Sequence, residues 1–169
     1  MRFGEKEVSK WTLVMIVTGT FMFVSMFLNV LNVTFLGESY GISGLDLMRG
    51  GFNIGFVEID SESLSVLRYI PLICSIIGAA VVILSVVTAY LEYDSRRLMI
   101  AVSLTLTVTL LLSVIFLMGG ASVEIFSGSA KDLLQGLLAT VTPMYGTYIA
   151  VFSTFVCGMA STYRMRECL

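Results

Sequence analysis

Three cysteines are the most reactive side chains of this chain: Cys74, Cys157 and Cys168. The first two fall within long apolar stretches and the third falls in the last residues, so none lies in a loop where an extracellular disulfide framework would form. We interpret Cys74 and Cys157 as small apolar packing groups. For Cys168, attachment of a lipid is the functional alternative.

Histidine is absent from the sequence. Haem, zinc and copper sites usually need histidine or clustered cysteines, so we predict neither a metal site nor a cofactor. We also find no nucleophile beside a base, no phosphate-binding loop and no paired carboxylates, so we expect no catalytic residues and no enzyme activity. The ten Lys and Arg residues form no block of the kind that binds nucleic acid.

Four long stretches of the sequence contain no charged residue, and the elements that they form must position the side chains discussed above. The stretches are residues 11–36, 69–91, 98–120 and 133–160. A helix rises ~1.5 Å per residue and needs about 20 residues to cross a bilayer core, so each stretch is long enough. With 57% apolar residues and a mean hydropathy of +0.94, the chain is predicted to be an all-α membrane protein with a four-transmembrane-helix bundle.

The expected organisation is one membrane domain over residues 1–169. Its spans are placed at about residues 11–36, 69–91, 98–120 and 137–160, and its outer loops at residues 37–68 and 121–136. No ionisable side chain falls inside the four uncharged stretches. Proton relays and ion-coupled transport usually need such groups, so neither is expected here.

The basic residues predict the orientation. Seven lie in the terminal segments and in the turn between the second and third spans: Arg2, Lys6, Lys10, Arg96, Arg97, Arg164 and Arg166. Only Arg49, Arg68 and Lys131 lie in the two outer loops. Positive residues stay on the cytoplasmic side, so we expect a multi-pass protein of the plasma (cell) membrane with both termini in the cytoplasm. The outer segments hold three basic and seven acidic residues, a net charge of −4, which is either a solvated face or an attraction for a basic partner.

Strand-like alternation in the outer segments predicts a small extracellular β-containing cap. Residues 51–60 and 122–126 alternate apolar with polar side chains, and residues 30–36 are rich in β-branched side chains. We expect the 51–60 segment to pair with residues 30–36 or with residues 122–126. Two strands alone would be marginally stable in water, so three or more are expected.

Two groups of residues are candidate interaction sites. Tyr40, Ser43, Gly44 and Asp46 predict a tight turn and a short helix in the first outer loop. They are interpreted either as a fixed connector or as a partner contact. The second group recurs every four residues along the last span and consists of small residues: Thr142, Gly146, Ala150, Thr154 and Gly158. Small residues at this spacing let two helix backbones approach closely, either within the bundle or at a subunit interface.

The layout resembles that of the claudin-like tetraspans, with cytoplasmic termini, a larger first outer loop with strand character and a smaller second one. The claudin signature of a tryptophan, Gly-Leu-Trp and two cysteines in the first loop is absent, because the only tryptophan is Trp11. The element Ser43-Gly44-Leu45-Asp46, followed by a second span that opens with Pro71, is similar to small prokaryotic four-span proteins. That resemblance implies no activity.

We therefore expect a non-catalytic membrane scaffold or accessory subunit that acts through helix–helix and outer-loop contacts. Its expected partners are the lipid bilayer and other membrane subunits, including further copies of the chain. The alternative is a channel or pore formed by an oligomer. Polar faces on the first span, such as Thr18 and Asn29, and on the third, such as Thr107, would line it.

Overall fold

The computed structural model describes residues 2–3, 6–7, 9–50, 52–54, 57–59, 64, 66–91, 96–120, 126, 132 and 139–167. Four long helices carry most of them. They are α1 (Lys10–Ser25), α3 (Ile70–Leu91), α4 (Arg96–Gly120) and α6 (Tyr145–Glu167). The shorter elements are β1 (Arg2–Phe3), β2 (Lys6–Glu7), β3 (Asn29–Phe35), β4 (Glu38–Ser43), α2 (Gly44–Arg49), β5 (Phe52–Ile54), β6 (Val57–Ile59), the 3₁₀ helix η2 (Val66–Tyr69) and β7 (Thr140–Pro143).

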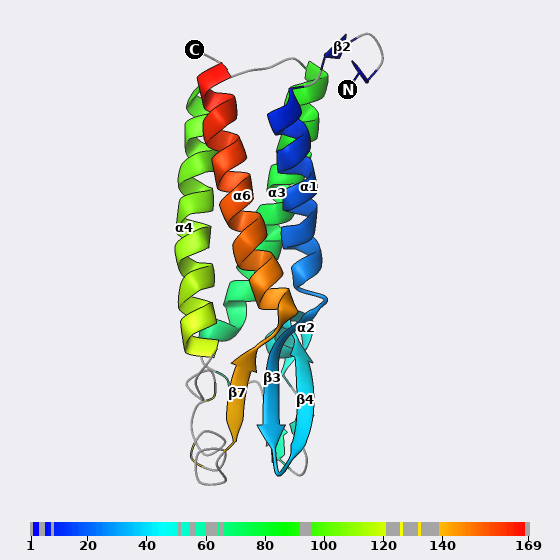
Figure 1. The fold of residues 1–169 in the computed structure, drawn as a ribbon, viewed down its shortest axis with the longest axis vertical. Helices are drawn as coiled ribbons and strands as arrows, with labels where there is room; N and C mark the ends of the chain where they lie inside the picture. Colours follow the sequence, from blue (N-terminus) through cyan, green and yellow to red (C-terminus); the bar gives the residue numbers. More distant parts are fainter. Residues whose placement is uncertain are drawn as a thin grey trace.

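The four long helices lie side by side as a bundle, and the strands β3, β4 and β7 form a cap at one end of it (Figure 1). Both chain termini lie at the opposite end (Figure 1). α1 packs mainly against α3 and α6, and α4 packs mainly against α6. The bundle therefore acts as a long support that holds the cap away from the termini.

The prediction of four membrane-spanning helices is wrong. Among the described residues only two helices are long and apolar enough to cross a membrane, Val66–Leu91 and Arg96–Gly119, with mean hydropathies of 2.7 and 2.5. The expected span over residues 11–36 fails because α1 ends at Ser25 after 16 residues. At ~1.5 Å per residue such a helix is shorter than the ~30 Å hydrocarbon core.

The expected span at about residues 137–160 fails for a different reason. Residues 140–143 belong to β7, and the helix α6 begins only at Tyr145. Its 23 residues are long enough, but the Tyr, Thr, Ser and Gly residues along it lower its hydropathy, and its last turn is charged by Arg164 and Arg166. From Thr140 onward, the uncharged stretch is thus a strand followed by a moderately polar helix.

The cap sheet has the strand order β4-β3-β7, and both pairs are antiparallel. β3 and β4 form a hairpin whose two turn residues, Leu36 and Gly37, have φ angles of 50° and 84°. Positive φ at both positions is the type I′ geometry that matches the twist of a two-residue hairpin. β7 returns from far along the chain to pair Val141 with Val33.

The strand expected over residues 30–36 is confirmed as β3. The expected pairing of the 51–60 segment with it is wrong, because β5 pairs with β6 within that segment. Residues 122–125 lie outside the described residues, while Phe126 forms an isolated bridge with Leu64.

Two apolar clusters hold the structure together. The cluster at the cap buries the inner sheet face against α2, β5, β6 and the adjacent helix ends, and it includes Leu31, Val33, Ile42, Leu47, Ile54, Ile59, Phe116, Phe126 and Val141. The second lies within the bundle and includes Met15, Met22, Val81, Leu106 and Cys157. On the opposite face of the sheet Asn32, Thr34, Thr140 and Thr142 are partly or fully exposed, the usual polar side of an antiparallel sheet.

Candidate functional site

The cap is fixed to the bundle by hydrogen bonds at the end of α1. The last carbonyls of a helix have no partner within it. Here the Met26 carbonyl accepts the Leu45 backbone N–H at 3.1 Å, and the Phe23 carbonyl accepts the Ser75 hydroxyl at 3.1 Å. Elements on both sides of the α1 terminus therefore hold it in place.

A second connection links β3 to the start of α6. The Val30 carbonyl accepts the Met144 backbone N–H at 2.9 Å and the Thr147 hydroxyl at 2.6 Å. Beside it, a Cβ added to Gly146 would lie 2.8 Å from the Asn29 carbonyl oxygen. Only a glycine fits this close approach, so the strand and the helix are held at a fixed distance.

The residues of the predicted small-residue stripe do not share one environment. Thr142 is exposed on β7 rather than on the helix, and its hydroxyl lies 3.5 Å from the Asn32 carbonyl. Ala150 and Thr154 are buried, and the Thr154 hydroxyl donates to the Ala150 carbonyl. A Cβ on Gly158 would meet only the Leu106 side chain at 3.9 Å, an ordinary contact.

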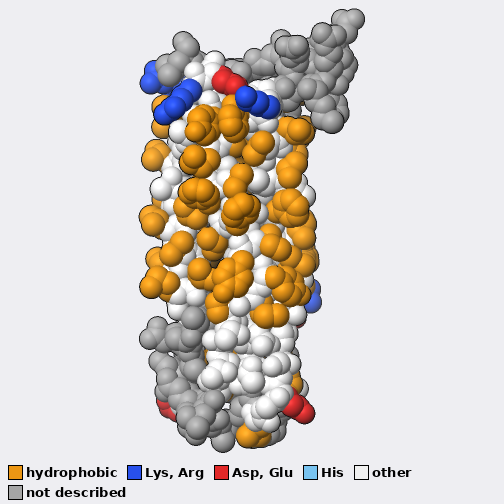
Figure 2. Space-filling model, in the orientation of Figure 1, with side chains coloured by type: hydrophobic (Ala, Val, Ile, Leu, Met, Phe, Trp, Pro, Cys, Tyr) orange, Lys and Arg blue, Asp and Glu red, His pale blue; other side chains and the backbone are white. Residues whose placement is uncertain are grey.

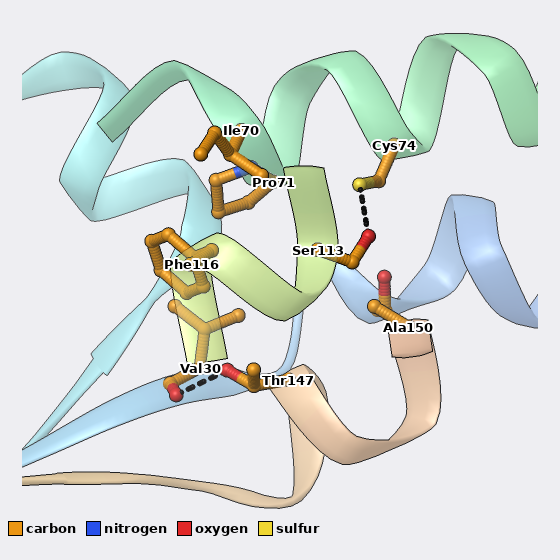
Figure 3. Close-up of a pocket in the computed structure, with 9 residues that line it drawn as sticks. Val30, Ile70, Pro71, Cys74, Ser113, Phe116, Thr147 and Ala150 are labelled. Atoms are coloured by element: carbon orange, nitrogen blue, oxygen red, sulfur yellow. Dashed lines mark hydrogen bonds between the residues drawn. The ribbon is translucent and has the colours of Figure 1, made fainter. Parts of the chain in front are cut away.

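A small cavity lies where α1, α3, α4 and α6 meet the cap (Figure 3). Its volume of about 10 Å³ is room for about one water molecule. The Cys74 sulfur and the Ser113 hydroxyl are 3.1 Å apart at its wall, and the Thr147 hydroxyl is engaged with Val30 (Figure 3). With its polar groups paired and its lining apolar, this cavity is a packing feature.

The larger hollow is an open groove on the cap with a volume of about 270 Å³. It lies between β4, α2 and β5, and its lining residues are Ser39, Tyr40, Gly41, Ile42, Asp46, Phe52 and Asn53. We call it the cap groove. It contains Tyr40 and Asp46 of the predicted partner-contact group, and it adds Phe52 and Asn53, which the sequence did not single out.

The other two predicted contact residues have structural roles. The Ser43 hydroxyl accepts the Asp46 backbone N–H at 3.1 Å, and the Asp46 carboxylate accepts the Ser43 backbone N–H at 3.2 Å, which is a capping box for α2. Gly44 is buried, and a Cβ there would lie 2.9 Å from the Met26 carbonyl oxygen. The segment from Tyr40 to Asp46 thus both connects β4 to α2 and lines part of the cap groove.

Two acidic side chains border the cap groove. The Tyr40 hydroxyl donates a hydrogen bond to the Glu38 carboxylate. This bond, followed by desolvation and by the negative charge of Glu38, raises the pKa of the Tyr40 phenol above its ordinary value of 10.0. Asp46 is exposed at the other side of the groove. Tyr40 is therefore neutral at physiological pH, and the charge at the groove is negative.

The outer surface of the bundle is apolar. Figure 2 shows a belt of hydrophobic side chains along the helices, with Lys and Arg side chains gathered at the end that carries the termini. Each long helix contributes to this apolar belt, for example with Phe21, Ile83, Leu104 and Phe152, which are 52%, 64%, 63% and 70% exposed. Such a contiguous apolar surface normally marks contact with a membrane or with protein.

Aromatic and basic side chains join α1 to α6 at the terminal end. The rings of Trp11 and Tyr163 stack with centroids 4.6 Å apart. Lys10 lies 5.3 Å from the Trp11 ring, and Arg166 lies 5.7 Å from the Tyr163 ring. The Ser9 hydroxyl also donates to the Glu167 carboxylate at 2.6 Å. These contacts hold the two terminal helices together.

Within the described part of the chain, no three His, Cys, Asp or Glu side chains lie together as a metal site would need. Cys74 and Cys157 are buried free thiols, and Cys168 lies outside the described residues. The described geometry offers surfaces for contact and no assembled set of reactive groups.

No known protein family, curated protein or solved structure matches this chain. The resemblance to the claudin-like layout and to small prokaryotic four-span proteins gains no support from these comparisons.

Proposed function

We propose that this protein is a non-catalytic scaffold or accessory subunit of the plasma (cell) membrane that contacts partner proteins through its outer cap. The observation that carries the proposal is the cap groove, which is held on a fixed sheet at the end of an apolar bundle. Sites for recognition are commonly loops positioned by a rigid support. The groove has that arrangement.

Membrane anchoring is supported by the two long apolar helices. α3 and α4 provide the stretches long enough to cross a bilayer, α1 and α6 pack against them, and the apolar belt lies against lipid. The stacked Trp11 and Tyr163, flanked by Lys10 and Arg166, are residue types that anchor helices at a cytoplasmic membrane surface, which supports this orientation. The cap then faces outward, and the end of α4 that carries Arg96 and Arg97 faces the cytoplasm.

The channel alternative receives less support. The cavity inside one bundle holds about one water molecule, so a pore would have to form between copies of the chain. On α4 the hydroxyls of Thr105, Thr107 and Thr109 each donate to the carbonyl four residues earlier. Since these hydroxyls satisfy their own helix, they do not call for a water-filled pore beside them.

Site-specific photo-crosslinking in native membranes tests the proposal. A photoreactive phenylalanine analogue replaces Phe52 in the cap groove, Thr142 on the exposed sheet face as the matched control, or Phe152 on the apolar belt. We expect protein adducts from position 52 and essentially none from position 142. Adducts from position 152 alone, or ion conductance of the purified chain in a planar bilayer, would contradict the proposal.

A further inference from the structure

Within the part of the chain that the structure describes, the strand β4 has a free edge. In the order β4-β3-β7 it has a described neighbour on one side only. The turn places Phe35 opposite Glu38, and in a two-residue hairpin this flanking pair is hydrogen-bonded, with bonded and non-bonded pairs alternating beyond it. Glu38, Tyr40 and Ile42 therefore bond to β3. Ser39 and Gly41 direct their backbone N–H and C=O groups away from the sheet.

These outward groups have no described backbone partner. In the part of the chain that the structure describes, no backbone hydrogen bond from another element ends on the N–H or C=O of Ser39 or Gly41. Both residues are exposed. An unpaired strand edge is a template for another strand, and native proteins usually cover or blunt such edges. Here no proline or lysine interrupts the six residues of β4.

The cap groove runs beside this edge. Ser39 to Ile42 form one wall, and Phe52 and Asn53 of β5 face them. Its volume of about 270 Å³ lies below the ~300–1,000 Å³ of ordinary small-molecule pockets, and the groove is open. A groove of this shape along a strand edge suits the alternate side chains of an added strand better than an enclosed ligand.

The negative charge of the groove indicates the charge of the segment that would bind there. Asp46 lines it and Glu38 borders it, whereas no lysine or arginine is among its lining residues. The outer segments as a whole carry a net charge of −4. Complementary charge both steers a partner and fixes its register, so the matching segment is basic.

We propose that β4 is a docking edge for an extended, basic segment of a partner protein, which adds as a fourth strand to the cap sheet. Its backbone bonds to Ser39 and Gly41, one apolar side chain contacts Phe52, and a lysine or arginine reaches Asp46. The inference rests on the proposed function and specifies the partner's chemistry. The added strand would extend the sheet without rearranging the cap.

A second copy of this chain fits the edge less well. The cap strands run along the long axis of the bundle (Figure 1). Antiparallel pairing of two β4 edges needs a two-fold axis perpendicular to the sheet, which turns one bundle upside down relative to the other. Two copies inserted alike in one membrane cannot pair in this way, so a separate segment is the better occupant.

The test uses the full chain in nanodiscs of phosphatidylcholine, whose neutral surface does not attract basic peptides. The probe is a fluorescent peptide of alternating lysine and valine, six residues long, and the control alternates glutamate and valine. Two further lysine peptides are N-methylated, one at every lysine amide and the other at every valine amide. In an added strand, alternate backbone N–H groups point in opposite directions, so the amides methylated in one of these two peptides face β4 and those methylated in the other face solvent. We expect the lysine peptide to bind more tightly than the glutamate peptide, and one methylated form to lose about tenfold in affinity while the other binds normally.

Variants of the chain locate the contact. Ser39→Pro removes an outward N–H and should weaken binding about tenfold, whereas Ser39→Ala keeps that N–H and should bind as wild type. Asp46→Asn retains a helix-capping side chain without its charge and should lower both affinity and salt dependence. Thermal unfolding checks that each variant is folded. If Ser39→Pro does not fold, the difference in binding between the two methylated peptides, measured on the wild-type chain, tests the inference.

Equal binding of both methylated peptides, equal binding of lysine and glutamate peptides, or unchanged binding by folded Ser39→Pro would overturn the inference. Crosslinks from position 52 together with any of these results would overturn strand addition alone. Absence of the crosslinks would overturn the proposed function itself.

Discussion

Gly19 on α1 and Gly78 on α3 meet backbone to backbone. A Cβ on Gly78 would lie 2.7 Å from the Gly19 carbonyl oxygen, and a Cβ on Gly19 would lie 3.0 Å from the Gly78 carbonyl oxygen. No side chain separates the two helices at this point. Close contact through small residues is how helices associate where apolar burial alone gives no preference.

Substitution of Gly78 should therefore be costly. Gly78→Leu inserts a side chain whose Cβ would lie only 2.7 Å from both the Gly19 carbonyl oxygen and the Met22 Cβ. We expect a loss of about 1–3 kcal/mol in stability, as overpacking usually causes. Thermal unfolding in detergent measures it. Ala80→Leu, on the exposed side of the same helix, is the matched control and should change the melting temperature little.

The two stripe glycines of α6 should differ from one another. Gly146→Ala places a methyl group 2.8 Å from the Asn29 carbonyl oxygen, and the backbone on both sides is hydrogen-bonded and cannot yield easily. Gly158→Ala meets only the Leu106 side chain at 3.9 Å. We expect the first to destabilise the fold by about 1–3 kcal/mol and the second to be neutral or stabilising through higher helix propensity. Equal effects in thermal unfolding would contradict this interpretation of the junction.

The sequence predicted the helices that charged residues or turns delimit. α3 and α4 lie close to the uncharged stretches 69–91 and 98–120. It failed where a strand is as free of charge as a helix. Asn29 to Phe35 continues the apolar run of α1 without a charged residue, and hydropathy does not distinguish the two conformations. The β-branched side chains were the usable signal.

The groove was only half predictable for a related reason. Tyr40 and Asp46 stood out locally through their turn and capping chemistry, whereas Phe52 and Asn53 acquire their role only because β5 folds back beside β4. Likewise β7 pairs with β3 across more than a hundred intervening residues. Contacts of that separation depend on tertiary packing, which a single sequence read locally does not reveal.

The hairpin turn offers a stabilising substitution. Leu36 has φ of 50° and is 72% exposed, so it is a bulky residue in a backbone conformation that asparagine tolerates better. Leu36→Asn creates the Asn-Gly pair favoured in type I′ turns, and we expect a gain of about 0.5–1 kcal/mol in stability. Gly37→Ala, at φ of 84°, is the converse change and should destabilise the fold. Both are measured by denaturant unfolding.

The ring stack at the terminal end should couple α1 to α6. A double-mutant cycle of Trp11→Ala and Tyr163→Ala isolates the contact from the loss of each side chain alone. With centroids 4.6 Å apart, we expect a coupling energy of about 0.5–1.5 kcal/mol. Phe155→Ala, exposed on the same helix and away from Trp11, replaces the tyrosine change in the control cycle, where additivity is expected.

The orientation in the membrane is the last prediction. Seven basic residues in the terminal and inter-helix segments against three in the segments at the cap predict that the cap lies outside the cell. Ser61 and Ser95 would be natural labelling positions but lie outside the described residues. Thr140 is exposed on the cap and Arg97 is exposed at the opposite end, so single cysteines at these two positions report the two sides.

The labelling starts from a chain with Cys168→Ser, in which the remaining Cys74 and Cys157 are buried. We expect Thr140→Cys to react with a membrane-impermeant maleimide in intact cells. Arg97→Cys should react only after permeabilisation, and six of the seven basic residues predicted to be cytoplasmic remain to maintain the charge asymmetry. Reversed labelling would place the cap groove in the cytoplasm. Reaction of both cysteines in intact cells would mean that no bilayer separates the two ends of the bundle, which would contradict the proposal that the bundle crosses the membrane.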